Sequence, residues 1–302
     1  ATLFYVIDKL KQDGYVKSVP RRGIYVSENP PHLCNYGLLF NNKLNTNVFW
    51  RKLHQEATTM CLSREDCKFQ NFYSDVVTDS DSQRLLKLLK RRMLAGIFMF
   101  YGPVHSLPKT IMEKYPDLPI VSFEELDPHP GMCRINFDIE AYMRELFDYT
   151  VSSGGHKLAV LAMGSQRLGK LIPPAAASYG LEIRKEWCQV VDPRSIESVK
   201  NMVYLLMALS KENRPDTLFL TDDNLLAPVQ SALVELGVKL PDELRLACHY
   251  NFPDDNDSVL PVYKIGYNAR DILSVGIDLI NQKRNGKNPA PAIIHPRSVS
   301  FK

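Results

Sequence analysis

The sequence has few cysteines, and no two of them are spaced as a pair. The six lie at positions 34, 61, 67, 133, 188 and 248, with no CxxC motif and no regular interval. A disulfide framework or a zinc site would need a more ordered spacing, so neither is expected. Free thiols are typical of the reducing cytosol, and we therefore expect a cytoplasmic protein with no metal and no other cofactor.

Long hydrophobic runs are also missing. The densest apolar stretch, residues 94–101, has the length of a strand and is far shorter than the ~20 residues of a membrane-spanning helix. The N-terminus lacks the basic, apolar and small-residue order of a secretory signal peptide. A chain of 302 residues, 45% hydrophobic and 24% charged, is instead expected to be a soluble globular protein of two domains.

The formal net charge is small, only +3, but it is unevenly distributed. Five of the 37 basic and two of the 34 acidic residues lie within residues 1–26, so the remainder of the chain carries 32 of each sign. The whole excess therefore lies in one terminal segment. A solvated basic edge and a surface for phosphate groups are both consistent with this distribution.

The pattern within residues 1–26 favours the second interpretation. Leu3, Ile7 and Leu10 have the spacing of an amphipathic helix, and Gly14 suits the position after a helix end. Two short strands, at 15–19 and 23–26, are predicted around the turn Pro20-Arg21-Arg22-Gly23. A helix followed by a hairpin with arginines at its tip is suited to contacts with DNA phosphates or a minor groove.

The segment ATLFYVIDKLKQDGYVKSVPRRGIYV resembles the recognition helix and wing of the GntR-type winged helix-turn-helix, where a P-x-R-G-x-Y/F-V wing follows the helix. The match begins within that motif, so we expect an incomplete reading head. The resemblance implies a partial winged-helix DNA-binding domain at 1–28, followed by a linker at 29–32. It implies DNA contacts by five residues: Thr2, Tyr5, Lys17, Arg21 and Arg22.

From residue 34 onward, short apolar runs alternate with amphipathic stretches. Strands are predicted at 36–40, 68–73, 96–101, 120–123, 158–163, 217–220 and 244–248. Helices are predicted at 49–62, 82–93, 139–152, 196–209 and 224–236. Such an alternation indicates an α/β protein with parallel sheets covered on both faces, and its length favours two doubly wound lobes over one.

The residues from Pro215 to Leu244 resemble the LacI/GalR effector-binding domain. PDTLFLTDDNLLA, then ALVELGV and LPDEL, follow the family pattern P-D-A-I-F-x-x-N-D-x-x-A, A-L-x-x-x-G and V-P-x-D-I. Shorter matches occur at 47–50, 152–159 and 260–261. The resemblance implies a periplasmic-binding-protein-like type I fold over 33–302. Its two lobes are expected at 33–137 with 268–288, and at 138–267 with 289–302.

In open parallel sheets, ligands bind beyond the carboxyl ends of the strands. The residues that end or follow the predicted strands are Asn41, Asp75, Tyr101, Glu124, Asp222, Tyr250 and Asn251. Carboxylates, amides and aromatic rings at one edge suit a sugar, with its hydroxyl groups and its apolar C–H face. The family resemblance adds Phe49, Trp50 and Arg167, and Trp187 is a further candidate. Each of these side chains has an alternative interpretation, as a loop polar group or a packing aromatic.

The sequence departs from the family pattern at two of these positions. Asp222 stands where the family usually has Asn, which replaces a donor and acceptor by an acceptor alone. Cys248-His249-Tyr250-Asn251 replaces the family's G-Y/F-D-D. Both changes concern groups that would contact an effector. The family's usual sugar preferences therefore cannot be transferred to this chain directly.

Patterns for catalysis are weak. Residues 164–171, GSQRLGKL, nearly match a phosphate-binding loop, but Leu171 replaces the hydroxyl residue that holds Mg²⁺. The seven histidines include no HExxH motif. No pair of nucleophile and base emerges, and we expect that the protein is not an enzyme.

We therefore predict a DNA-binding transcription regulator, a repressor, acting as a homodimer on operator DNA. A small carbohydrate effector, bound between two lobes, is expected to control its affinity for that DNA. The alternative is a sugar-binding protein of a transport system. An enzyme on a doubly wound fold is a third possibility, which turnover of a bound ligand would reveal.

Overall fold

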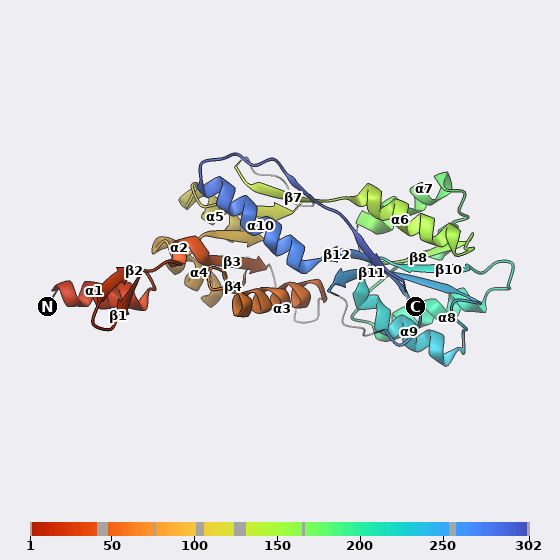
Figure 1. Cartoon of the computed structure of the whole chain (residues 1–302). Helices are drawn as coiled ribbons and strands as arrows, with labels where there is room; N and C mark the ends of the chain where they lie inside the picture. Colours follow the sequence, from red (N-terminus) through yellow and green to blue (C-terminus); the bar gives the residue numbers. More distant parts are fainter. Residues whose placement is uncertain are drawn as a thin grey trace. The chain divides into compact units, whose positions relative to one another are not determined.

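The computed structural model describes residues 2–40, 48–74, 77–100, 106–123, 131–164, 167–253 and 258–300. Contacts along the chain divide it into two compact units (Figure 1). Unit 1 comprises Ala1–Thr46, Trp50–Asn136 and Arg270–Ile294, and unit 2 comprises Asn47–Phe49, Phe137–Ala269 and His295–Lys302. Unit 1 thus also contains the N-terminal segment, which the prediction had set apart as a domain of its own.

The N-terminal segment forms a helix and a hairpin. Helix α1 spans Thr2–Gln12, and the antiparallel strands β1 and β2 span Val16–Val19 and Gly23–Val26. Gly14 has a φ of +80°, the left-handed conformation that ends a helix and that glycine adopts without strain. The short helix α2, Pro31–Cys34, then leads into the first sheet and includes two residues of the expected linker.

Unit 1 is built on a six-stranded sheet with the order β13-β7-β6-β5-β3-β4. The ladders from β4 through β7 are parallel. The strands are β3 (Asn35–Phe40), β4 (Lys68–Tyr73), β5 (Gly96–Met99), β6 (Ile120–Phe123), β7 (Cys133–Phe137) and β13 (Ala292–Ile294). All six residues of β3 are buried, as expected for an apolar strand inside a sheet covered on both faces.

Four helices cover the two faces of this sheet. They are α3 (Val48–Ser63), α4 (Ser80–Lys90), α5 (Ser106–Lys114) and α10 (Ala269–Arg284). On one face, leucines of α4 and α5 pack against Ile97 and Met99 of β5. On the other, α10 contacts Phe98 of the same strand, and its Arg270 forms an ion pair with Glu56 of α3. Alternate side chains of β5 therefore pack against two separate layers of helices.

Unit 2 repeats this plan with the strand order β14-β12-β11-β10-β8-β9. Only the β12–β14 ladder is antiparallel among the pairings described. The strands are β8 (Leu158–Met163), β9 (Cys188–Val191), β10 (Thr217–Leu220), β11 (Arg245–Phe252), β12 (Tyr263–Asn268) and β14 (Arg297–Val299). The helices are α6 (Ile139–Ser152), α7 (Arg167–Ser178), α8 (Ile196–Ala208) and α9 (Leu226–Glu235), with 3-10 turns at Lys185–Trp187 (η1) and Asp223–Leu225 (η2).

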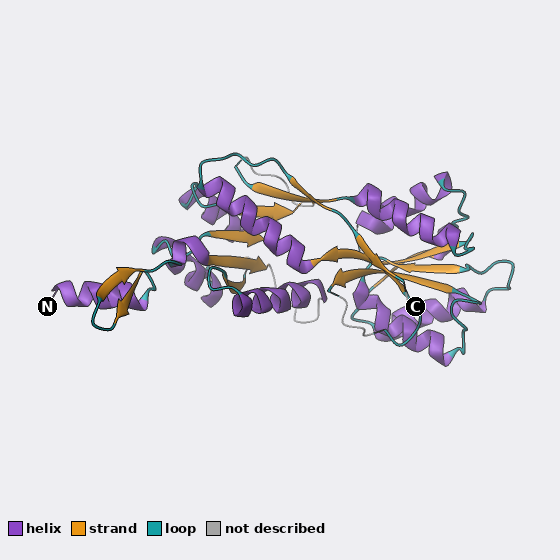
Figure 2. Cartoon of the chain, viewed as in Figure 1, coloured by secondary structure: helices purple, strands orange, loops and turns teal. Residues whose placement is uncertain are grey.

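The predicted α/β class with two doubly wound, mostly parallel sheets is confirmed, and helices lie on both faces of each sheet (Figure 2). The helices and strands that the sequence did not indicate are α2, β7, β9, β12, β13, β14, α5, α7 and α10. Their patterns are mixed. Strand β12 includes Lys264 and Gly266, and α7 continues through Pro173 and Pro174.

Candidate functional site

Aromatic rings cross the carboxyl edge of the sheet in unit 1. The edge carries Phe123 at the end of β6, Phe100 after β5, Phe40 at the end of β3 and Tyr73 at the end of β4. Neighbouring ring centroids are 4.8, 4.8 and 5.3 Å apart, with interplanar angles of 17°, 6° and 19°. We call these four residues the aromatic row. Phe40 and Phe123 are buried, at 0% and 8% exposure, so Phe100 and Tyr73, which are partly exposed, are the rings of the row that are open to a ligand.

Helix α3 adds a fifth ring to the aromatic row. Trp50, in its first turn, lies 5.2 Å from Phe40 between ring centroids. Both Trp50 and its neighbour Phe49 are partly buried. The other residues proposed for this unit, Asn41, Asp75, Tyr101 and Glu124, lie outside the described residues.

At the carboxyl edge of unit 2, Asp222 follows β10 and caps the η2 turn. One oxygen of its carboxylate accepts a hydrogen bond from the backbone N–H of Asn224 at 2.9 Å, and the Asn224 side-chain amide also donates to it. The residue is only 8% exposed. The Asp222 carboxylate is thus held in a defined orientation by the turn that it begins.

The next residue, Asp223, is held by the neighbouring strand. The backbone N–H of Asn251 in β11 donates to its carboxylate at 2.9 Å, and the side-chain amide of Asn251 donates to both oxygens at 3.0 and 3.1 Å. Burial, reinforced by the negative charge of Asp222, raises the pKa of Asp223 to about 7, although these hydrogen bonds act in the opposite direction. Near neutral pH this edge therefore holds a carboxyl group that can gain or lose a proton.

A partly buried histidine extends this polar cluster away from the strand ends. His249 precedes Tyr250 on β11, and its Nδ1 lies 3.1 Å from the hydroxyl oxygen of Tyr142 in α6. Burial lowers the pKa of His249, while the charge of Asp222 and a hydrogen bond with Asn251 act to raise it. Desolvation thus favours the neutral form of the His249 imidazole.

Two aromatic residues proposed for the site lie within the core instead. Trp187 is completely buried in the cluster formed by β8, β10, α8 and α9, with the Arg184 guanidinium 4.7 Å from its ring centroid. Tyr250 is 1% exposed and belongs to the same cluster. The Lys264 ammonium nitrogen lies 4.4 Å from its ring centroid, a cation–π contact. The structure therefore gives both rings a packing role.

Arg167 begins helix α7, directly beyond the carboxyl end of β8. Its side chain is exposed, and the helix packs closely on its strand at Gly169, where a Cβ would lie 2.6 Å from that of Ala162. The strand order places β8 beside β10. Arg167 and Asp222 therefore follow neighbouring strands at one edge of the same sheet.

The residues proposed to contact DNA lie on α1 and the hairpin, and all five are exposed. Thr2 and Tyr5 lie on α1, where Tyr5 is 72% exposed. Arg21 and Arg22 form the tip of the hairpin and are also exposed. Arg21 has a φ of +62°, a left-handed conformation that is uncommon outside glycine.

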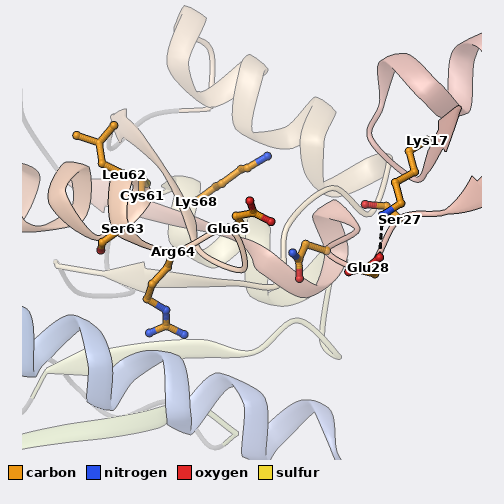
Figure 3. A pocket seen from close by; sticks show the side chains of 10 residues that line it. Lys17, Ser27, Glu28, Cys61, Leu62, Ser63, Arg64, Glu65 and Lys68 are labelled. Atoms are coloured by element: carbon orange, nitrogen blue, oxygen red, sulfur yellow. Dashed lines mark hydrogen bonds and ion pairs between the residues drawn. The ribbon is translucent and has the colours of Figure 1, made fainter. Parts of the chain in front are cut away.

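Lys17 has a different environment. Its ammonium donates to Glu28 at 2.7 Å, and both residues line a cavity of about 600 Å³ (Figure 3). The opposite wall of this cavity comes from the end of α3 and the following turn, including Arg64 and Glu65. An ion pair with Glu28 has to be broken or shared before Lys17 contacts a phosphate group.

The N-terminal segment is attached to unit 1 through a small contact near the end of α4. Asp13 forms an ion pair with Arg91. The hydroxyl of Tyr15 donates to the backbone carbonyl of Arg92 at 2.8 Å, and the Tyr15 ring stacks on His32 at 5.6 Å between centroids. The contact consists mainly of polar and stacking interactions between a few side chains.

Among the described residues, no group of three or more His, Cys, Asp or Glu side chains is arranged to hold a metal ion. No helix in that part of the chain combines the length and the apolar composition needed to cross a bilayer.

No protein-family model matches the sequence. Solved structures are nevertheless similar. A LacI-family regulatory protein from Chloroflexus aggregans is 17% identical, with a TM-score of 0.68 over 87% of this chain and 96% of that chain. A LacI-family regulator from Lactobacillus casei was solved with bound glucose and is 18% identical, with a TM-score of 0.64 over 88% and 97%. The structure of the same regulator with bound sucrose is 17% identical to this chain. Its TM-score is 0.65, over 88% of this chain and 98% of that chain.

This chain has the fold of LacI-family regulators. The agreement extends over both units, because the matches cover nearly nine tenths of the chain. The aromatic row, Asp223 and the His249–Tyr142 contact were not predicted from the sequence. The row had a detectable signal, since an aromatic residue ends or follows each of four predicted strands. Asp223 stands at the Asp of the family's N-D pair, but the strand-end argument selected only its neighbour Asp222.

Proposed function

We propose that this protein is a DNA-binding transcription regulator, a repressor, whose affinity for operator DNA is controlled by a sugar. The observation that supports sugar binding is the aromatic row at the carboxyl edge of unit 1, in which Phe100 and Tyr73 are partly exposed. Carbohydrates present both an apolar C–H face and many hydroxyl groups, so they bind best where rings and hydrogen-bonding groups are both supplied. The similarity to regulators solved with glucose and sucrose supports the same class of ligand.

Within unit 2, Asp222, Asn251 and Arg167 are the polar groups that we assign to effector binding. The Asp222 carboxylate offers acceptors only, so the effector has to present hydroxyl or amine donors to it. Both acidic residues at this edge are held by hydrogen bonds before any ligand arrives. Such preorganisation reduces the ordering that binding requires.

For DNA binding, we assign α1 and the hairpin as the end of a GntR-type winged helix. The exposed Tyr5, Arg21 and Arg22 support this assignment. A homodimer would bring two such heads to two half-sites. The sugar would act through its different affinities for two conformational states of the protein, one of which binds the operator more tightly.

The effector site is tested by thermal unfolding of the protein against a panel of monosaccharides and disaccharides. A sugar that binds only the native state stabilises it by RT ln(1 + [L]/Kd), about 2.7 kcal/mol at 100 times Kd. Asp222→Ala, Arg167→Ala and Phe100→Leu should each reduce this stabilisation. Asp242→Ala, an exposed residue in a turn of unit 2, is the matched control and should leave it unchanged.

The DNA-binding function is tested by selecting genomic fragments with the full-length protein, with and without the sugar identified in the panel. We expect a bound sequence with two half-sites, and an affinity that the sugar changes. Arg22→Ala should weaken binding to all fragments, since phosphate contacts carry little sequence information. Sugar binding without any sequence-specific DNA binding would contradict the proposal and favour a transport-associated sugar-binding protein.

A further inference from the structure

A second cavity in unit 1 lies at the opposite edge of the sheet from the aromatic row. Its volume is about 460 Å³, within the range of about 300–1,000 Å³ typical of small-molecule sites. It opens at the amino ends of β5 and β6, where Leu94 and Leu118 precede the two strands. Since the proposed effector residues of this unit are at the carboxyl ends, this cavity is a separate place on the molecule.

The floor of the cavity is apolar. Leu89 and Leu94 are each 5% exposed and Ala95 is 2% exposed, and Leu118 and Pro119 complete the surface. These side chains continue into the core between the sheet and helices α4 and α5. A ligand with an apolar body can therefore bury that body here without displacing a polar group.

The rim, in contrast, is basic. Arg92 follows the end of α4, Lys114 ends α5 and Arg284 ends α10, whereas Asp117 is the single carboxylate of the lining. Basic side chains are favoured at the C-terminal ends of helices, and this preference explains each of the three basic residues taken singly. Here three such ends meet around one apolar floor. Their positive charges are thereby concentrated over a cavity of ligand size.

The guanidinium and ammonium groups on the rim have N–H donors that no protein group accepts among the described residues. Among the described residues, neither Arg92 nor Lys114 forms an ion pair or a side-chain hydrogen bond. Arg284 uses only its Nη1, which donates to Leu33 and Asn281 at 3.2 and 3.3 Å. An Arg guanidinium has five N–H donors in a fork that suits carboxylate and phosphate oxygens.

The backbone of Arg92 offers an independent indication. Its φ is +53°, in the left-handed region, where a residue with a side chain is strained by about 1 kcal/mol or more. The residue stands where helices often end in glycine, with Met93 N–H bonded to the Leu88 carbonyl. Glycine would end the helix without strain. The side chain at this position therefore has a cost that helix termination does not explain.

We propose that this cavity binds a small organic anion, with a carboxylate or phosphate group against Arg92, Lys114 and Arg284 and an apolar body on Leu89, Leu94 and Leu118. The inference does not depend on the proposed sugar site or on DNA binding. His32 and Arg92 line this cavity, and both also contact Tyr15 of the N-terminal segment. The site therefore adjoins the attachment of the N-terminal segment.

Isothermal titration calorimetry with three probes tests the class of ligand. Phenyl phosphate combines both features, inorganic phosphate lacks the apolar body, and benzyl alcohol lacks the charge. We expect phenyl phosphate to bind about tenfold or more tightly than either of the other two. Equal binding of phenyl phosphate and inorganic phosphate would overturn the proposal, as would the absence of phenyl phosphate binding.

Variants then locate the site. Arg92→Gly should relieve the backbone strain, raise the melting temperature and weaken phenyl phosphate binding by about fivefold or more. Arg21→Gly is its matched control, since Arg21 is also left-handed but lies in the hairpin, and it should leave binding unchanged. Asp117→Asn removes the only carboxylate of the lining and should strengthen binding. Unchanged affinity in both Arg92→Gly and Asp117→Asn would place the anion elsewhere and refute the assignment.

Discussion

Asn251 donates three hydrogen bonds to the Asp223 carboxylate, one from its backbone N–H and two from its side-chain amide, across the carboxyl edge of the sheet in unit 2. Asp223 begins the turn after β10 and Asn251 lies on β11, so this contact ties a loop to the neighbouring strand. The same loop carries Asp222, the acidic residue that we assign to the effector. The orientation of Asp222 thus depends on Asn251, a buried residue of the neighbouring strand.

The raised pKa of Asp223 makes a prediction about stability and pH. The folded value of about 7 exceeds the ordinary 3.8, so between these values the folded protein holds a proton that the unfolded chain has lost. Stability should therefore fall as pH rises from about 4 to about 7, because the unfolded state binds fewer protons in that range. In Asp223→Asn this fall should be absent.

Urea unfolding across pH 4.5 to 8 measures this effect. Asp223→Asn also loses an acceptor, so it should be less stable by about 1–3 kcal/mol at the lowest pH, with the difference narrowing toward pH 8. Asp242→Asn, in an exposed turn, should keep the pH dependence of the original protein. A constant difference between Asp223→Asn and the original protein at every pH would contradict the assignment.

Trp187 should contribute to stability and not to effector binding. The side chain is completely buried, so Trp187→Phe leaves a small cavity and should lower the free energy of unfolding by about 1–3 kcal/mol. The sugar-dependent rise in melting temperature should persist in this variant. If this rise were lost in Trp187→Phe, Trp187 would have to be assigned to the binding site. The substitution also leaves Trp50 as the single tryptophan, so its fluorescence becomes a direct probe of α3.

Close packing between α10 and the sheet predicts a specific pattern of rescue. A Cβ at Gly276 would lie 2.0 Å from Cε1 of Phe98, so Gly276→Ala should destabilise the protein by about 1–3 kcal/mol. Phe98→Leu makes room, and the double variant should recover about 1 kcal/mol relative to additivity. Gly266→Ala is the contrasting case, because its Cβ would lie 1.9 Å from the Tyr250 carbonyl oxygen, which no side-chain change can move. Chemical denaturation of the four proteins of the Gly276 and Phe98 cycle measures the coupling.

The attachment of the N-terminal segment can be followed through His32. Burial, and then the charge of Arg284, lowers the pKa of His32 below its ordinary 6.5. Tyr15→Ala removes the ring stacked on this imidazole, and the pKa of His32 should then rise toward 6.5 in an NMR titration. Tyr25→Ala, which changes a ring within the hairpin, should leave that pKa where it is. An unchanged titration in Tyr15→Ala would show that the stacked contact does not form in solution.

Much of the architecture was predictable from local patterns. The strands at 68–73, 120–123, 158–163 and 217–220 have the predicted bounds. Three of these runs are mainly apolar, and the fourth, KFQNFY, has aromatic residues between polar ones. Strands such as β7, with Arg134 and Asn136, were not predicted. In a strand at or near the edge of a sheet, the neighbouring strands and helices decide which side chains can remain polar, so a mixed sequence does not reveal the strand.

The candidate site was only partly predictable for a similar reason. Reasoning from strand ends selected Asp222 and Asn251, and the structure places them at the ends of adjacent strands. The same reasoning selected Tyr250, whose side chain points into the core, since neighbouring residues of a strand face opposite sides of the sheet. Sequence position alone does not say which of two consecutive residues packs into the hydrophobic cluster.

By itself, the sequence determined the α/β class, the alternation of strands and helices, and the concentration of positive charge in residues 1–26. These properties depend on apolar periodicity and on charge counts, which are local. The tertiary structure decided which strands are neighbours, and therefore that four aromatic rings form one row, that Asp223 meets Asn251, and that three basic helix ends surround one apolar cavity. Each of these depends on residues far apart in the chain, and their proximity is set by the packing of sheets and helices.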